Sequence, residues 1–192
     1  MVAASLQIEA SAAKDALRLE RVVAATATDA SREWVRQAAT MVAEQWPNRH
    51  SVDGLTARFV HASSDPDNYG LPASYLLMEG EECLGHARLT DCFEGFGGSA
   101  AAVTFVVICA AHRGLGLGRS LMSLVEAEAT RLGYFYLYLW TQGAVGFYRK
   151  LGYLLCERVS LQRPCFRSLK QQQVRGLEAL MARRAEAFAA GE

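Results

Sequence analysis

The chain has 192 residues, a formal net charge of zero at pH 7 and a hydrophobic fraction of 51%. This length suits one domain with a core of ordinary size, and we expect residues 1–192 to form it. A neutral chain disfavours bulk electrostatic binding to nucleic acid or to an anionic membrane, so neither is an expected partner.

The first part of the chain predicts a strand followed by a helix. Residues 1–16 are rich in alanine and weakly patterned, which indicates a loose tail or a loose helix. Residues 17–22 alternate apolar and charged side chains, which favours a half-exposed strand. A helix with Asp29 or Ser31 as its N-cap follows and ends at Pro47, because proline disfavours α geometry in the residue before it.

The middle of the chain predicts three successive strands. They follow residues 47–73, whose Asn, Asp, Ser, Gly and Pro predict an excursion of helix and loop. The strands are expected over residues 74–78, 83–91 and 101–109, separated by glycine-containing turns.

The last part of the chain predicts helices alternating with strands. We expect a helix over 119–132, a strand over 134–140, a short helix over 144–151 and a last strand over 156–162. Apolar residues at helical spacing over 168–189 predict a C-terminal amphipathic helix that packs on the same domain. A monomer or a weak dimer is therefore expected.

The pattern of cysteines and the absence of long apolar segments predict that the protein is located in the cytoplasm. The five cysteines include no Cys-x-x-Cys pair and no histidine-ligand spacing, which predicts free thiols and no metal site. The N-terminal segment has no apolar signal core, and the longest apolar run, residues 100–111, is too short to cross a bilayer. We expect a soluble, cytoplasmic protein.

A glycine-rich segment, His112-Arg113-Gly114-Leu115-Gly116-Leu117-Gly118-Arg119, follows the third middle strand and opens a helix. Such a turn directs backbone N–H groups and the helix dipole at a pyrophosphate, and Gly116 and Gly118 allow close approach. The segment lacks the Gly-Lys-Ser/Thr ending of an NTPase loop. It also lies mid-chain, with no acidic ribose-reading residue after the next strand, unlike a dinucleotide fold.

Two motifs resemble the GNAT acetyltransferases. The spacing Arg113-x-x-Gly116-x-Gly118 after a hydrophobic strand resembles their coenzyme A loop, and Phe147-Tyr148-x-x-x-Gly152-Tyr153 resembles their later helix and turn. The resemblance implies an α/β (α+β) fold with a mixed, mostly antiparallel, twisted sheet of about six to seven strands flanked by helices. The sheet would splay between strands four and five, where the cosubstrate acetyl-CoA would bind without a metal.

The resemblance also implies roles for single residues. Tyr148 would be the general acid, because a phenol with a pKa of about 10 can protonate a thiolate whose conjugate acid has a pKa near 8.5. The base is open, since Thr104 stands where many members have a glutamate; His86 and Tyr138 are the candidate residues. Acetyl-CoA would contact Val106, Val107, Ile108, Arg113, Gly114, Leu115, Gly116, Leu117, Gly118, Arg119 and Thr141.

Further segments resemble the actin-type protein N-terminal acetyltransferases. They are Glu44-Gln45-Trp46-Pro47 and Gly85-His86-Ala87-Arg88-Leu89, together with the helix-and-turn motif. This branch implies that the acceptor is the α-amino group of a protein with an acidic N-terminus. Trp46 would line the peptide groove, and Arg49 and Arg58 would bind the acidic residues.

Two other functions stay open. A GNAT enzyme for a small amine, such as a polyamine, an aminoglycoside or an amino acid, could use Asp53, Asp65 and Asp67 as acceptor ligands. A non-catalytic acetyl-CoA-binding module is favoured by Thr104 and disfavoured by Tyr148. Basic rather than acidic side chains beside the acceptor site would favour the acidic N-terminus.

Overall fold

The structure is a computed structural model that describes residues 6–7, 17–22, 28–60, 71–91, 100–155 and 179–184. The described residues divide between two compact units, which comprise residues 1–89 with 105–125 and residues 90–104 with 126–192. The elements are β1 (Leu6–Gln7), β2 (Arg18–Arg21), α1 (Asp29–Gln45), α2 (Val52–Val60), β3 (Ala73–Glu79), β4 (Glu82–Asp91), β5 (Ala100–Ile108), a 3-10 helix (Ala110–His112), α3 (Leu117–Arg131), β6 (Tyr136–Thr141), α4 (Val145–Lys150), β7 (Leu154–Leu155) and β8 (Ala179–Arg184).

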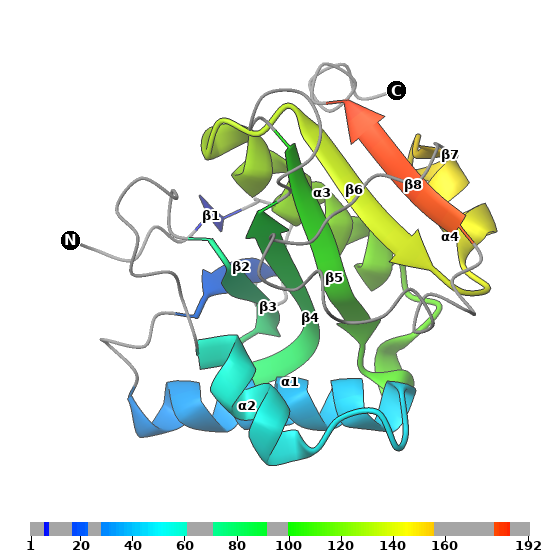
Figure 1. The fold of residues 1–192 in the computed structure, drawn as a ribbon. Coiled ribbons are helices and arrows are strands. Elements are labelled where there is room, and N and C mark those ends of the chain that lie inside the picture. Colours follow the sequence, from blue (N-terminus) through cyan, green and yellow to red (C-terminus); the bar gives the residue numbers. More distant parts are fainter. Residues whose placement is uncertain are drawn as a thin grey trace, which may run out of the picture. The chain divides into compact units, whose positions relative to one another are not determined.

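The first unit contains an antiparallel meander of strands β1, β2, β3 and β4, in that order (Figure 1). Six successive residues of β3, Ala73–Met78, are buried, so both faces of this strand are covered. The three predicted middle strands are confirmed as β3, β4 and β5, with shifts of at most one residue at their ends. Strand β1 lies within the segment predicted as a loose tail, and the rest of that segment is outside the described residues.

Helices α1 and α2 pack side by side in the first unit (Figure 1). The N-cap of α1 is Thr28, whose Oγ1 accepts from the Ser31 N–H at 3.2 Å, so the predicted caps were one to three residues late. The helix ends at Gln45, before Pro47, as predicted. Both helices bury one face against the sheet, in a cluster of Val35, Ala38, Ala39, Val42, Leu55, Phe59, Leu76, Met78, Cys83 and Val107.

Strand β5 contributes to both units, since Ala100–Thr104 belongs to the second and Phe105–Ile108 to the first. It pairs with β6 in parallel, from Ala100↔Tyr136 to Val103↔Leu139. The pairing stops there, although β5 runs on to Ile108 and β6 to Thr141. All of the paired residues belong to the second unit. The divergence expected between the fourth and fifth strands, which correspond to β5 and β6, stays a prediction.

The C-terminal segment corrects the prediction of a helix over 168–189. Residues 179–184 form β8, which pairs antiparallel with β6 and with β7 (Figure 1). A strand forms here because the second edge of β6 carries backbone N–H and C=O groups that need partners, and this requirement outweighs helix propensity. The rest of that segment, and the strand predicted over 156–162, lie outside the described residues.

Two further findings concern the described ranges. Their helices are all too short or too polar to span a bilayer. Cys83 and Cys109 are free thiols, as predicted, and burial raises the pKa of the Cys83 thiol to about 12.

Candidate functional site

The glycine-rich segment joins β5 to α3 in the first unit and has an open backbone. Gly114 and Gly116 have φ angles of 83° and 84°, a region that side chains with a Cβ rarely adopt. Apart from the glycine itself and the residues on either side of it, no described atom lies within 4 Å of where a Cβ would stand on either residue. Helix α3 begins at Leu117, and the N–H groups of Arg119 and Ser120 both donate to the Gly116 carbonyl, at 2.9 and 3.2 Å. The N–H groups of Leu117 and Gly118, which precede them in the first turn, are the helix donors that could bind an anion.

The side chain of Arg113 forms hydrogen bonds with the end of β5 and with the end of α1. Its Nε donates to the Ile108 carbonyl at 3.1 Å, and its Nη2 donates to Oε1 of Gln45 at 2.7 Å. A guanidinium has five N–H donors, so these two bonds leave others for a pyrophosphate. The predicted contact of Arg113 with the cosubstrate stays a prediction, and the bond to the end of α1 was not foreseen.

Strand β5 contains a local distortion at Phe105. Its φ angle is 52°, in the left-handed region, where a bulky side chain is an outlier and indicates a bulge. The burial pattern breaks at the same place, because Thr104, Phe105 and Val106 are all partly exposed between buried neighbours. Sequence reasoning missed Phe105; its signal was a single large ring in a run of small and β-branched residues.

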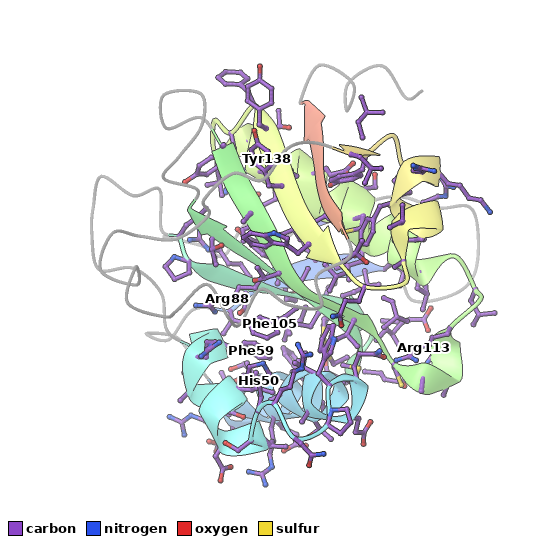
Figure 2. The ribbon with its side chains drawn as sticks, turned by 45° about the vertical axis from the view of Figure 1, so that its right-hand side comes forward. His50, Phe59, Arg88, Phe105, Arg113 and Tyr138 are labelled. Atoms are coloured by element: carbon purple, nitrogen blue, oxygen red, sulfur yellow. The ribbon has the colours of Figure 1, made fainter. Side chains whose placement is uncertain are left out.

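The ring of Phe105 gathers side chains from α2 and from the segment after α1. The rings of Trp46, His50 and Phe59 meet it edge-on, with centroids 6.4, 5.5 and 5.7 Å away. The guanidinium carbon of Arg58 lies 5.7 Å from the same centroid, a cation–π contact. Figure 2 shows His50, Phe59 and Phe105 close to one another between the helices and the sheet. Two predicted acceptor residues, Trp46 and Arg58, are thus brought together.

Positive charge concentrates around this ring. Burial lowers the pKa of His50, and the nearby charges of Arg58 and Arg49 lower it further. Arg88, which is 3% exposed, donates from Nη1 to Ser74 Oγ at 2.8 Å. Burial, and then the charge of Arg58, lowers the pKa of Arg88 to about 10, so it remains charged at pH 7. We call Arg49, His50, Arg58 and Arg88 the basic cluster.

Of the three acidic residues considered for a small amine, only Asp53 lies within the described residues. Asp53 is exposed, and its Oδ1 lies 3.8 Å from Nη1 of Arg36 on α1. Asp65 and Asp67 lie outside the described residues. In the parts of the chain that are described, no three His, Cys, Asp or Glu side chains are grouped as a metal ion would require.

His86 on β4 is fully buried, with 0% of its surface exposed. Its Nδ1 lies 2.9 Å from the carbonyl oxygen of Phe105, and its ring stacks on Phe59 with centroids 3.9 Å apart. A carbonyl only accepts, so Nδ1 carries the proton. Burial lowers the pKa of His86 to about 3, although the bond to Phe105 opposes the shift. The imidazole is therefore neutral at pH 7 and is poorly suited to hold a proton as a base.

The remaining predicted catalytic residues lie in the second unit. Tyr148 on α4 is 7% exposed, and its ring meets those of Phe147 and Tyr153 edge-on, with centroids 5.0 and 5.7 Å away. Burial raises the pKa of Tyr148 to about 12, so the hydroxyl is protonated at neutral pH but is a weaker acid than an exposed phenol. Tyr138 packs in a core cluster, and Thr141 is buried at the end of β6.

The other predicted cosubstrate residues lie in the first unit. Val106, Val107 and Ile108 end β5, Leu115 is exposed in the glycine-rich segment, and Arg119 lies in the first turn of α3. Gly118 is already the second residue of α3, and the two left-handed glycines of the segment are Gly114 and Gly116. The order of strand, glycine-rich loop and helix is the one that the sequence predicted, and pyrophosphate binding there stays a prediction.

Comparisons with solved structures identify the fold. The chain is 14% identical to Tetrahymena GCN5, with a TM-score of 0.61 and coverage of 87% of this chain and 95% of that one. An acyl-CoA N-acyltransferase from Pseudomonas aeruginosa is 22% identical, with a TM-score of 0.59 and coverages of 87% and 99%. An aminoglycoside 6'-N-acetyltransferase complexed with coenzyme A is 13% identical, with a TM-score of 0.58 and coverages of 82% and 92%. These likenesses establish the GNAT fold.

The family model described as Acetyltransferase (GNAT) family matches residues 32–153, which is most of the chain. The matched range includes most of α1 and all of strand β5, the glycine-rich segment and α4. The chain therefore belongs to the GNAT family of acetyltransferases.

Proposed function

We propose that the protein is an acetyl-CoA-dependent N-acetyltransferase whose acceptor is the α-amino group of a protein with an acidic N-terminus. The observation that carries this proposal is the basic cluster around the Phe105 ring. Carboxylates beside the acceptor amine would form charge-assisted hydrogen bonds with the exposed arginines of this cluster, Arg49 and Arg58. The lowered pKa of His50 leaves that imidazole neutral at pH 7. A polyamine or an aminoglycoside would instead meet like charge there.

The geometry of the glycine-rich segment supports the proposal that acetyl-CoA is the cosubstrate. Open backbone at Gly114 and Gly116, followed by a helix N-terminus, fits a pyrophosphate. Two similar solved structures, the aminoglycoside enzyme and a Tetrahymena GCN5 domain, are described as complexes with coenzyme A. When bound, acetyl-CoA would supply an activated acetyl group as a thioester. In this proposal residues 113–119 and the backbone of 106–108 bind it, and Thr141 is a further contact.

Acetyl transfer to an α-amino group does not require a strong general base. Such a group has an unperturbed pKa of about 7.7–8, so a substantial fraction is neutral at cellular pH. Tyr148 would hold the proton that the departing thiolate needs. Its raised pKa keeps that proton in place but lowers the driving force for giving it up. Tyr138 and His86 remain the candidate bases from the sequence, and their burial disfavours both.

The test is an acetyl-CoA thiol-release assay with matched acceptors. We expect turnover of free-amine peptides that begin Asp-Asp or Glu-Glu, and much less turnover of the same peptide that begins with Ser or Met. An internal-lysine peptide and spermidine are the contrasting amines. Turnover of spermidine alone would replace the proposal with a small-amine acetyltransferase. Acetyl-CoA binding without any turnover would favour a non-catalytic module.

The variant Arg58→Ala separates charge recognition from general damage. It should raise KM for the acidic peptides about ten- to a hundredfold, because each charge-assisted bond contributes about 1.5–3 kcal/mol and 1.4 kcal/mol is about tenfold. Arg32→Ala is the matched control, since Arg32 is an exposed arginine of α1 paired with Asp29 at 3.3 Å. If both variants change KM equally, the basic cluster is not the acceptor site.

A further inference from the structure

We propose that Gly85 and His86 of β4 are positioning residues, which hold the left-handed Phe105 and the end of β5 in the conformation used for acetyl transfer. This inference rests on the proposed function. It assigns His86 a role through hydrogen bonding rather than through proton transfer.

The first support is the bond between His86 and Phe105. A bulky residue at a φ angle of 52° is unfavourable, and it persists only where its surroundings fix it. The Nδ1–H of His86 reaches the Phe105 carbonyl at 2.9 Å from a fully buried position, so solvent does not compete. The stack on Phe59 fixes the plane of the imidazole, and with it the direction of this N–H.

The second support is the close approach of β4 at the preceding residue. A Cβ added to Gly85 would lie 2.6 Å from Cδ1 of Ile108 and 2.8 Å from the carbonyl oxygen of Val107. One residue earlier, the Leu84 carbonyl accepts from the Cys109 N–H at 2.8 Å. Three successive residues of β4 thus hold β5 from Phe105 to its end.

The third support is that this part of β5 contributes both the Phe105 ring and the backbone proposed to meet the acetyl group. Phe105 follows the point where pairing with β6 stops, and its ring contacts Trp46, His50 and Arg58. The backbone just after it, at Val106–Ile108, is the part proposed to meet the acetyl group. Rotation of the Phe105 backbone would displace the acceptor-side ring and these peptide groups together.

Two variants distinguish positioning from proton transfer. In His86→Asn, the amide nitrogen occupies the place of Nδ1, so the donor to Phe105 is kept while the second ring nitrogen is lost. In His86→Leu, both are lost. We expect kcat with the acidic peptide to fall about ten- to a hundredfold in His86→Leu and to stay within about threefold in His86→Asn. KM for acetyl-CoA, which binds mainly through the glycine-rich segment, should change less than kcat.

Amide hydrogen exchange of the β5 peptide gives a readout that needs no activity. Exchange over residues 105–109 should accelerate in His86→Leu and not in His86→Asn. If the wild-type protein acetylates no amine, the proposed function fails, and this exchange comparison still tests the bond. Equal loss of kcat in both variants would show that the ring nitrogen acts as a base, and would overturn the proposal, as would wild-type kcat and exchange in His86→Leu.

The tautomer of His86 can also be read in the unmodified protein, should His86→Leu fail to fold. Nitrogen-15 chemical shifts of the imidazole at pH 7 should show a neutral ring protonated at Nδ1. A ring protonated at Nε2, or at both nitrogens, contradicts the proposal because it removes or changes the bond to Phe105.

Discussion

Acidification should destabilise this protein through His86 in particular. The pKa of His86 is about 3 in the folded chain and 6.5 when unperturbed, and the side chain is fully buried. Below pH 6.5 the unfolded chain therefore takes up a proton that the folded chain does not. Stability from this group is complete above pH 6.5 and is lost as the pH falls toward 3. One unit of pKa corresponds to about 1.4 kcal/mol, so lowering the pH from 7 to 5 should remove about 2 kcal/mol.

The assay is urea unfolding of the wild-type protein and of His86→Asn at pH 7 and at pH 5. Asparagine does not titrate, so the variant should lose about 2 kcal/mol less of its free energy of unfolding over this interval. Comparing the two losses removes the contribution of carboxylates and of His50, which are common to both proteins. Equal losses in the two proteins would refute the reasoning, because they would mean that His86 is not held in its neutral form by burial.

Three other predictions concern the core, the general acid and the glycine-rich segment. Phe59→Ala should lower the free energy of unfolding by about 3–5 kcal/mol, because the ring is buried. Phe135→Ala, at a ring that is 56% exposed, should change this free energy by less than about 0.5 kcal/mol. Similar denaturation midpoints for the two variants would contradict the prediction. Tyr148→Phe should lower kcat about a hundredfold or more and leave acetyl-CoA affinity unchanged in calorimetry, and an unchanged kcat would remove Tyr148 from the mechanism. Gly116→Ala should raise the Kd for acetyl-CoA about tenfold, because alanine is strained by about 1–2 kcal/mol at a φ angle of 84°. Gly146→Ala, at a position with open space, should bind like the wild type.

Local signals were sufficient for much of the fold. Strands β3 to β5 were predictable because alternating and β-branched runs are bounded by glycine-containing turns. The end of α1 was predictable from Pro47, and the start of α3 from the glycines before it. These features depend on residues near one another in the chain, so the sequence displays them directly.

Features set by distant contacts were not predictable in the same way. The segment of β8 has a helical pattern, and its strand conformation depends on pairing with β6, about forty residues earlier. The left-handed angle at Phe105 depends on a histidine 19 residues away. The sequence indicated Trp46, Arg49 and Arg58 through a family likeness, but not the ring that gathers them or the additional charge of Arg88.

The late position of β8 has a consequence for how the chain is made. Strand β6 is complete at residue 141, yet the segment that pairs along its second edge is translated only after residue 178. During synthesis that edge has backbone groups able to pair with another chain, which is a known route to aggregation. Shortening the gene before Ala179 would make this transient state permanent. Soluble yield and self-association should therefore depend on residues 179–184, although these residues lie far along the sequence from the Gly114–Gly116 segment.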